Sequence, residues 1–190
     1  MAYRVFMPLA EEWTAERARA LPDDGNRYEV LDGLLAVTPA PSWRHQDVAF
    51  LLQRALQEYL RHHALGRAIC APADVEFSSR RLLQPDLFVV PHVAGRAPAR
   101  WEEVQHLLLA VEVRSPSTAR HDRHTKRAIY MAETVDEYWI VDAEARVVER
   151  WRRDEERPEI VAEQIAWRPT ATLPALDIDL VALFREAMGE

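Results

Sequence analysis

Two stretches of sequence decide the fold, Pro-Asp-Leu-Phe-Val-Val at residues 85–90 and Leu-Leu-Leu-Ala-Val-Glu-Val at residues 107–113. Each combines an apolar run of strand length with one carboxylate, Asp86 before the first run and Glu112 near the end of the second. Such runs are typical of strands that are buried on both faces of a sheet. A buried carboxylate is costly unless it is paired, hydrogen-bonded or bound to a cation. The two stretches therefore predict buried strands whose ends carry a divalent-metal site.

The rest of the sequence alternates between helical and strand patterns, with no internal repeat and no long linker. We therefore expect one domain over residues 1–190, of the α/β (α+β) class, with a sheet and helices packed against it. The expected elements are a helix at 9–20, a hairpin at 28–37 turned at Asp32-Gly33, a helix from Ser42 to about His63 ended by Gly66, one or two strands at 67–79, a helix at about 119–133 capped from within 115–118, a hairpin at 137–151, a strand at 159–165 and a helix at 179–188.

The bulk composition is that of an ordinary globular protein. The chain has 190 residues, of which 48% are hydrophobic and 29% are charged. It contains no run of 18 or more apolar residues, which argues against a membrane span. The N-terminus lacks the long apolar stretch of a signal peptide, and the single cysteine, Cys70, permits no internal disulfide. We therefore expect a cytoplasmic protein.

The net charge of −7 bears directly on possible partners. Dedicated nucleic-acid binders usually carry a basic footprint, because their affinity comes largely from neutralising phosphates. This chain has only local basic clusters, such as the one at residues 150–153. The acidity counts against tight non-specific binding to DNA. It leaves room for a metal-dependent nuclease, because bound cations reverse the local sign of the charge.

The two strand-end acids are of the type that Mg²⁺ prefers. Mg²⁺ is commonly held by one or two carboxylates together with water and substrate phosphate. Asp86 and Glu112 are 26 positions apart and on separate predicted strands, so a sheet can bring them together. The backbone carbonyl of Val113, the next residue along the strand, is a candidate for a further oxygen ligand. Metal polarisation of phosphate and an activated water are what phosphodiester hydrolysis requires.

A lysine on the following predicted helix completes this set. Lys126 is placed to orient or deprotonate the attacking water, or to stabilise the charge of the transition state. Asp122, Lys126 and Tyr130 are spaced by four residues and therefore share one helix face. Helical side chains lean toward the N-terminus, which points Lys126 back toward the strand end with Glu112. The simpler alternative is an exposed i,i+4 ion pair between Lys126 and Asp122.

The residues match a known family, the Uma-type restriction endonucleases, which belong to the PD-(D/E)XK nuclease superfamily. This resemblance covers most of the chain and implies a restriction-endonuclease-like core, with a mixed central β-sheet flanked by helices. It also implies Mg²⁺ or Mn²⁺ as cofactor and DNA as substrate. The matching residues are Pro85-Asp86, Glu112 to Thr118, the spaced set Asp122, Lys126 and Tyr130, Glu137 to Asp142, and upstream Tyr28 to Gly33 and His45-Gln46.

Within this resemblance, Asp86 corresponds to the first aspartate of the superfamily and Glu112 to its second acid. Arg114 stands at the position where the superfamily has its lysine. Arginine stays protonated in proteins, so Arg114 is able to bind phosphate but not to act as a base. In the Uma-type group the lysine is displaced to the next helix, where Lys126 occupies its place. The resemblance therefore assigns the catalytic set to Asp86, Glu112 and Lys126.

Four further residues have both a structural and a functional interpretation. Glu29 lies in the predicted hairpin, where a solvated side chain is the default, but the resemblance makes it an additional acid beside the site. His45 falls in the first turn of a helix, either as a satisfied core histidine or as an orienting group. Tyr130 is more simply a packing residue. Arg114 is a possible ion-pair partner of the strand-end acids.

Two classes of function remain open on the sequence. The first is a metal-dependent endonuclease that hydrolyses DNA by attack of metal-activated water. The second is a catalytically silent protein that keeps the nuclease fold as a nucleic-acid or protein interaction module, which the acidic charge and Arg114 favour. Because cutting both strands of DNA calls for two sites, we also expect a homodimer. The apolar hairpin at 137–151 is the candidate interface.

Overall fold

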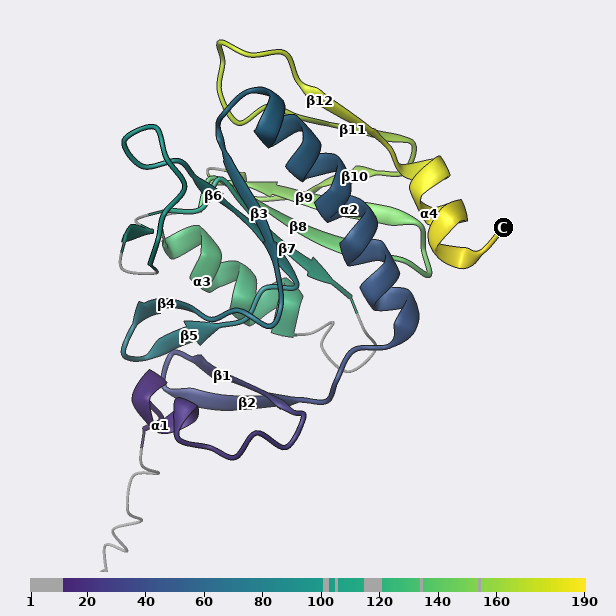
Figure 1. Cartoon of the computed structure of the whole chain (residues 1–190). Coiled ribbons are helices and arrows are strands. Elements are labelled where there is room, and N and C mark those ends of the chain that lie inside the picture. The colour runs from purple at the N-terminus through teal and green to yellow at the C-terminus, as the bar shows by residue number, and fades with distance from the viewer. Residues whose placement is uncertain (1–11, 101–102, 105, 115–120, 134, 154) are drawn as a thin grey trace, which may run out of the picture.

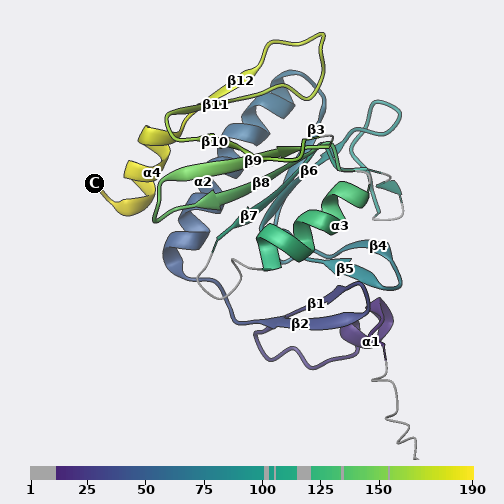
Figure 2. The same ribbon diagram turned by 180° about the vertical axis from the view of Figure 1, so that it is seen from behind.

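The computed structural model of the chain describes residues 12–100, 103–104, 106–114, 121–133, 135–153 and 155–190. The strands of these residues form three sheets, of six, four and two strands. The six-stranded sheet occupies the centre, with the long helix α2 (Trp43–His62) across one face in Figure 1. Seen from behind in Figure 2, helix α3 (Arg127–Ala132) lies on the opposite face. The structure confirms the mixed, helix-flanked architecture.

The central sheet is antiparallel except at one pair of strands. Strands β7 and β8 are parallel, and a parallel pair requires a long crossover, usually helical. Here the crossover contains the π-helix η2 (His121–Lys126) followed by α3. It connects the end of β7 to the start of β8, which runs parallel to β7. The sheet order is β10 (Glu159–Val161), β9 (Val147–Arg152), β8 (Glu137–Asp142), β7 (Leu109–Val113), β6 (Leu87–Pro91) and β3 (Gly66–Cys70).

The four-stranded sheet is formed by the N-terminal hairpin and a second hairpin that packs beside it. Asp32 and Gly33 turn the first hairpin, both with positive φ, a combination that an Asp-Gly pair favours. The short helix α1 (Ala15–Arg19) packs against β1. This layer lies at the bottom of Figure 1. The sheet order is β2 (Leu34–Thr38), β1 (Arg27–Leu31), β5 (Arg81–Leu83) and β4 (Val75–Ser78).

Two apolar cores lie on the two faces of the central sheet. The first fills the space under α2, the C-terminal helix α4 (Leu180–Met188) and the small sheet of β11 (Gln164–Trp167) and β12 (Leu176–Asp179). Ser42 caps α2 as expected, because its side chain accepts a hydrogen bond from the amide of His45. The second core lies under α3 and the N-terminal sheet, and includes Phe88 and Tyr138. The acids of the predicted site belong to this second face.

Gly66 has a different role from the one predicted. Helix α2 already ends at His62, and the chain turns at Ala64, which has positive φ. Gly66 instead begins β3, where an added Cβ would lie 2.1 Å from the carbonyl oxygen of Val90. The glycine is therefore required by the close approach of β3 to β6.

The proposed interface at residues 137–151 is also wrong. All six residues of β8 are buried, and β8 lies between β7 and β9 inside the sheet, so this hairpin offers no free face.

Strands β5 and β12 were not predicted, and the expectation of one sheet misses the two smaller ones. The caps predicted within residues 115–118 lie outside the described residues. Among the described helices, none is long and apolar enough to cross a membrane.

Candidate functional site

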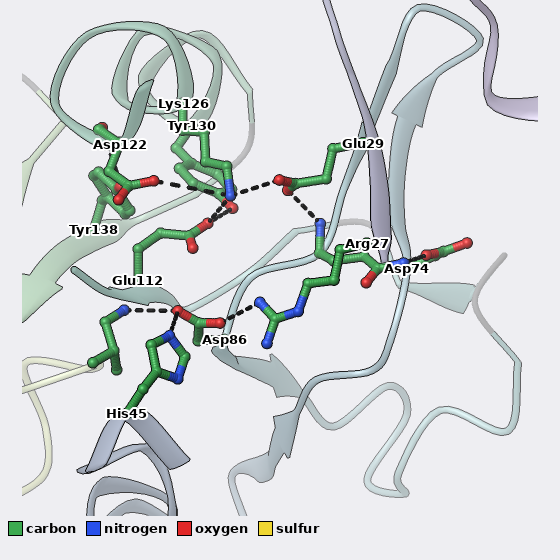
Figure 3. Close-up of polar contacts among 12 residues, drawn as sticks. Arg27, Glu29, His45, Asp74, Asp86, Glu112, Asp122, Lys126, Tyr130 and Tyr138 are labelled. Carbon is green, nitrogen blue, oxygen red and sulfur yellow. Dashed lines mark hydrogen bonds and ion pairs between the residues drawn. The ribbon is translucent and has the colours of Figure 1, made fainter. Parts of the chain in front are cut away.

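The predicted site residues converge where the central sheet meets the N-terminal sheet. Figure 3 shows them turned toward one another from separate parts of the chain. Five elements or their immediate neighbours supply the side chains: Arg27 and Glu29 come from β1, His45 from the first turn of α2, Asp86 from the residue before β6, Glu112 from β7, and Asp122 and Lys126 from η2.

The strand register places the two principal acids side by side. Strands β6 and β7 are antiparallel and pair Leu87 with Val111, so the next residues outward are Asp86 and Glu112. Directly opposed residues of antiparallel strands have Cβ atoms about 5 Å apart and point to the same face. Both side chains are 3% exposed. The two apolar runs of the sequence thus bring their carboxylates together at one edge of the second core.

Asp86 receives donors from three different parts of the structure. Its Oδ1 accepts from the Arg27 guanidinium, and its Oδ2 lies 2.8 Å from His45 Nε2. The backbone amide of Val113 also donates to Oδ2, at 2.8 Å. Burial opposes ionisation of Asp86, but His45 and Arg27 outweigh burial and lower the pKa of this carboxyl. Asp86 is therefore a carboxylate at neutral pH.

Glu112 and Lys126 form a second, tighter group. Lys126 Nζ lies 3.0 Å from Glu112 Oε1 and 2.9 Å from Glu29 Oε2, and the Tyr130 hydroxyl donates to Glu112 Oε1 at 2.9 Å. Asp122 Oδ1 is 4.0 Å from the same ammonium. Burial lowers the pKa of Lys126, but Glu112, Glu29 and Asp122 outweigh burial and raise it above its ordinary value. Lys126 is therefore protonated.

The cluster contains more acid than base. Its buried carboxylates are Glu29, Asp86, Glu112 and Asp122, and its permanently charged cations are Arg27 and Lys126. Among the described residues of this cluster, acidic side chains therefore outnumber basic ones. Burial raises the pKa of Glu112, Lys126 opposes this, and the neighbouring carboxylates add to the effect of burial, so the pKa lies well above its usual value.

These features fit a divalent cation. Asp86 and Glu112 are buried side by side and supply the hard oxygen donors that such an ion prefers. Both acids line a cavity of about 320 Å³, together with Val113 and Lys126. In the described part of the chain, no three His, Cys, Asp or Glu side chains are arranged as a metal-holding group. The protein would then supply one or two carboxylates, and water and phosphate the other ligands, as is common for Mg²⁺.

The remaining predicted residues are placed as follows. Glu29 is not solvated: it is 2% exposed and accepts from the backbone amide of Gln84 as well as from Lys126. Tyr130 is fully buried and both packs and donates to Glu112. Arg114 does not pair with the strand-end acids, because it forms an ion pair with Asp142, although it lines the cavity.

The simple surface pair of Lys126 and Asp122 is excluded, because Lys126 is 4% exposed and Asp122 is 1% exposed. For Val113, the contact that the structure shows is from its amide to Asp86. A ligand role for the Val113 carbonyl stays a prediction.

Sequence reasoning missed Arg27 and an unusual property of Lys126. Arg27 precedes the hairpin motif in a polar context, and only the packing of the N-terminal sheet brings it to Asp86. Lys126 is the only lysine among the 24 lysine and arginine residues of the chain. This second signal is present in the sequence, since a chain that otherwise uses arginine throughout has its one lysine at the candidate site. Lysine differs from arginine in carrying a compact ammonium group.

A mixed sheet with acids at the ends of adjacent strands is the architecture of restriction-endonuclease-like proteins. The family model described as "Uma2: Putative restriction endonuclease" matches residues 15–181, so the chain belongs to this family. A similar solved structure is the crystal structure of a putative nuclease belonging to DUF820 from Anabaena variabilis. It has a TM-score of 0.74 and 15% sequence identity, and the alignment covers 92% of this chain and 98% of that chain. At this low sequence identity, the structural similarity shows that the two proteins share a fold. No curated protein matches the sequence.

Proposed function

We propose that this protein is a metal-dependent endonuclease that hydrolyses DNA phosphodiester bonds by attack of metal-activated water. The observation that carries the proposal is the convergence of two buried acids from neighbouring strands, Asp86 and Glu112, beside one protonated lysine. Membership of a family described as "Putative restriction endonuclease" supports it. The similar fold of a protein described as a nuclease is consistent with it.

In this proposal Asp86 and Glu112 hold Mg²⁺ or Mn²⁺, with the Val113 carbonyl as a further ligand. The bound ion would polarise the phosphate and lower the pKa of a water molecule. The chain fixes the Asp86 carboxylate through the Val113 amide and His45, so that its orientation is set before any ligand arrives. Such preorganisation removes the cost of orienting the group during the reaction.

Lys126 acts as a charged donor in this proposal rather than as a general base. Its pKa is raised, so the ammonium form persists at neutral pH and has no lone pair with which to accept a proton. Held between Glu29 and Glu112, the ammonium is placed to orient the attacking water and to stabilise negative charge that develops on the phosphate. Of the roles that the sequence allowed for Lys126, deprotonation of water is therefore the one that the charge state disfavours.

The alternative function, a catalytically silent interaction module, has one observation in its favour. Both oxygens of Asp86 already have partners from the chain, namely Arg27, His45 and the Val113 amide. Such a network could be purely structural. The two functions differ in what they predict for metal: an endonuclease binds Mg²⁺ or Mn²⁺ through Asp86, whereas a silent module has no need for the ion.

The test is a cleavage assay on a mixture of DNA substrates with Mn²⁺, comparing the wild type with Lys126→Ala and Asp86→Asn. We expect cleavage by the wild type and a loss of about 10²-fold or more in each variant. Arg54→Ala is the matched control, because Arg54 forms an exposed pair with Glu186 and does not line the cavity. Circular dichroism checks that each variant is folded. Wild-type protein that binds Mn²⁺ but cuts no DNA would favour the silent module.

We also propose that the active form is a cytoplasmic homodimer, since cleavage of both DNA strands calls for two sites. The buried β8–β9 hairpin does not supply the interface. Light scattering of the protein with and without duplex DNA measures the mass directly. A mass of one chain under both conditions contradicts the dimer and leaves the site proposal intact.

A further inference from the structure

The two oxygens of Asp86 are held in different ways. Oδ2 lies 2.8 Å from the backbone amide of Val113 and 2.8 Å from His45 Nε2. The Val113 amide belongs to β7, where Val113 is paired with Val141 of β8, so it cannot move without disturbing that register. Oδ1 is paired with the guanidinium of Arg27, whose side chain is 17% exposed. One oxygen is therefore fixed by backbone, and the other is held by a flexible side chain.

This difference decides which oxygen is available to a metal ion. A carboxylate oxygen that binds a cation must direct a lone pair to it, and a guanidinium and a divalent ion repel each other at the same oxygen. Since Oδ2 is held by the sheet, Oδ1 is the atom that a cation would take. Arg27 occupies that position in the structure. Binding of a cation at Asp86 and pairing of Arg27 with Asp86 Oδ1 therefore compete with each other.

We propose that Arg27 is a phosphate-binding residue of the site, held on Asp86 until a divalent cation displaces it. This inference rests on the proposed function and names a further substrate contact for it. Once displaced, the guanidinium remains at the cavity that holds Asp86 and Glu112, because Arg27 lines it. A planar guanidinium donates to two oxygens at once and suits a phosphate better than a point charge does. The scissile phosphate is the anion that the cavity would receive.

The N-terminal strand that carries Arg27 is anchored well enough for this exchange. Glu29 lies two residues further along the same face of β1. Its Oε2 is 2.9 Å from Lys126 Nζ, and its Oε1 accepts a hydrogen bond of 2.8 Å from the backbone amide of Gln84. Strand β1 is also paired on both sides, with β2 and β5. Exchange therefore requires only a side-chain rotation of Arg27, while the backbone and Glu29 stay in place. His45 and the Val113 amide keep Asp86 oriented throughout.

The first arm of the test measures Mn²⁺ binding without nucleic acid, by the loss of the free-Mn²⁺ electron paramagnetic resonance signal. Arg27→Gln removes the competing cation, so it should bind Mn²⁺ about tenfold more tightly than the wild type. Arg27→Lys retains a charge and should stay close to the wild-type affinity. Arg54→Gln removes one positive charge from an exposed pair and serves as the matched control. Thermal unfolding confirms that each variant is folded.

The second arm measures binding of a short DNA duplex in Ca²⁺, with gels to show that the duplex stays intact. Arg27→Gln should bind DNA more weakly, and the slope of log K against log salt should fall in magnitude by about 0.9, the value for one lost phosphate contact. Arg54→Gln should leave the slope unchanged. The signature of the exchange is thus a single variant that gains affinity for metal and loses affinity for DNA.

The outcomes separate this inference from the proposed function. If the wild type binds no Mn²⁺, the proposed function itself fails. If the wild type binds Mn²⁺ and Arg27→Gln binds it equally or more weakly, Arg27 is only an orienting partner of Asp86 and the inference is wrong. An unchanged salt slope for DNA in Arg27→Gln would likewise overturn the phosphate contact, whatever the metal affinity.

Discussion

Two clusters of buried charge lie on opposite faces of the central sheet, and they are built differently. On the face under α2 and α4, Arg150 Nε donates to Glu137 Oε1 at 2.5 Å, and the Trp139 indole donates to the same oxygen at 2.6 Å. There one buried acid meets one buried base, and Arg150 Nη1 also lies 3.6 Å from the half-exposed carboxylate of Glu159. On the other face, the candidate site holds four buried carboxylates against Arg27 and Lys126.

The two clusters distinguish a structural ion pair from a functional one. A balanced and fully hydrogen-bonded pair such as Glu137–Arg150 is complete in the protein alone. In the candidate site, burial and the neighbouring carboxylates hold the pKa of Glu112 well above its usual value despite Lys126, so ionisation of this group carries a cost. Natural proteins retain such a cost chiefly where function requires it. The comparison therefore predicts opposite responses to mutation on the two faces.

The largest effect on stability should come from breaking the balanced pair. Arg150→Met leaves Glu137 buried without its cation and should lower the free energy of unfolding by about 3–5 kcal/mol. Arg54→Met, which breaks an exposed pair, should change it by less than about 0.5 kcal/mol. Urea denaturation measures both values. If Arg150→Met costs no more than Arg54→Met, the pair is not the structural element that we describe.

A smaller but sharper effect is expected for Lys126→Arg. The charge is kept, but the planar guanidinium does not fit the position of an ammonium that lies about 3 Å from both Glu29 and Glu112. We expect the rate of DNA cleavage to fall about 10²-fold, equivalent to about 2.7 kcal/mol. Single-turnover cleavage assays measure this rate. Wild-type activity in Lys126→Arg would show that any cation serves at this position.

Glu112→Gln should stabilise the metal-free protein, whereas Arg150→Met should destabilise it. The folded pKa of Glu112 is raised, so the folded state binds the proton more tightly than the unfolded state does. Stability is therefore lost as the pH rises from the ordinary value of 4.5 through the raised folded value. Neutral glutamine removes this loss, so the Tm of the variant should exceed that of the wild type at pH 8. A lower Tm at pH 8 would mean that ionisation of Glu112 does not destabilise the folded state.

The smallest effect is expected at the acid end of the pH range. The pKa of Asp86 is lowered, so its contribution to stability is fully present above the ordinary value of 3.8 and is lost as the pH falls through the folded value. Asp86→Asn should therefore be less stable than the wild type at pH 5, and the difference should shrink toward pH 2. Denaturant titrations at several pH values measure the difference. A constant difference would show that the loss is not due to ionisation.

Local patterns were sufficient to predict much of this arrangement. The apolar runs located β6 and β7 and their acids, the Asp-Gly turn located the first hairpin, and Ser42 located the start of α2. These predictions succeeded because each depends on a few residues that are adjacent or one helix turn apart. The four-residue spacing around Lys126 also brought the expected side chains together, although this segment is a π-helix rather than an α-helix.

The features that could not be predicted depend on packing between distant segments. Glu29 is buried because the hairpin packs on the central sheet and η2, which no pattern within the hairpin shows. Arg27 reaches Asp86 across 59 positions of sequence for the same reason. Gly66 is required by the carbonyl of Val90 on a neighbouring strand, so its role was mistaken for that of a helix end. The gathering of buried acids at the site likewise depends on the packing of these separate segments.

Binding of a divalent cation by the acidic cluster can be tested directly through Lys126. Because Lys126 is the only lysine, labelling with ¹⁵N-lysine gives a single side-chain ammonium signal from inside the site. Titration with Mg²⁺ should shift this signal in a saturable manner in the wild type and leave it unchanged in Asp86→Asn. A wild-type signal that does not move up to millimolar Mg²⁺ would contradict the account.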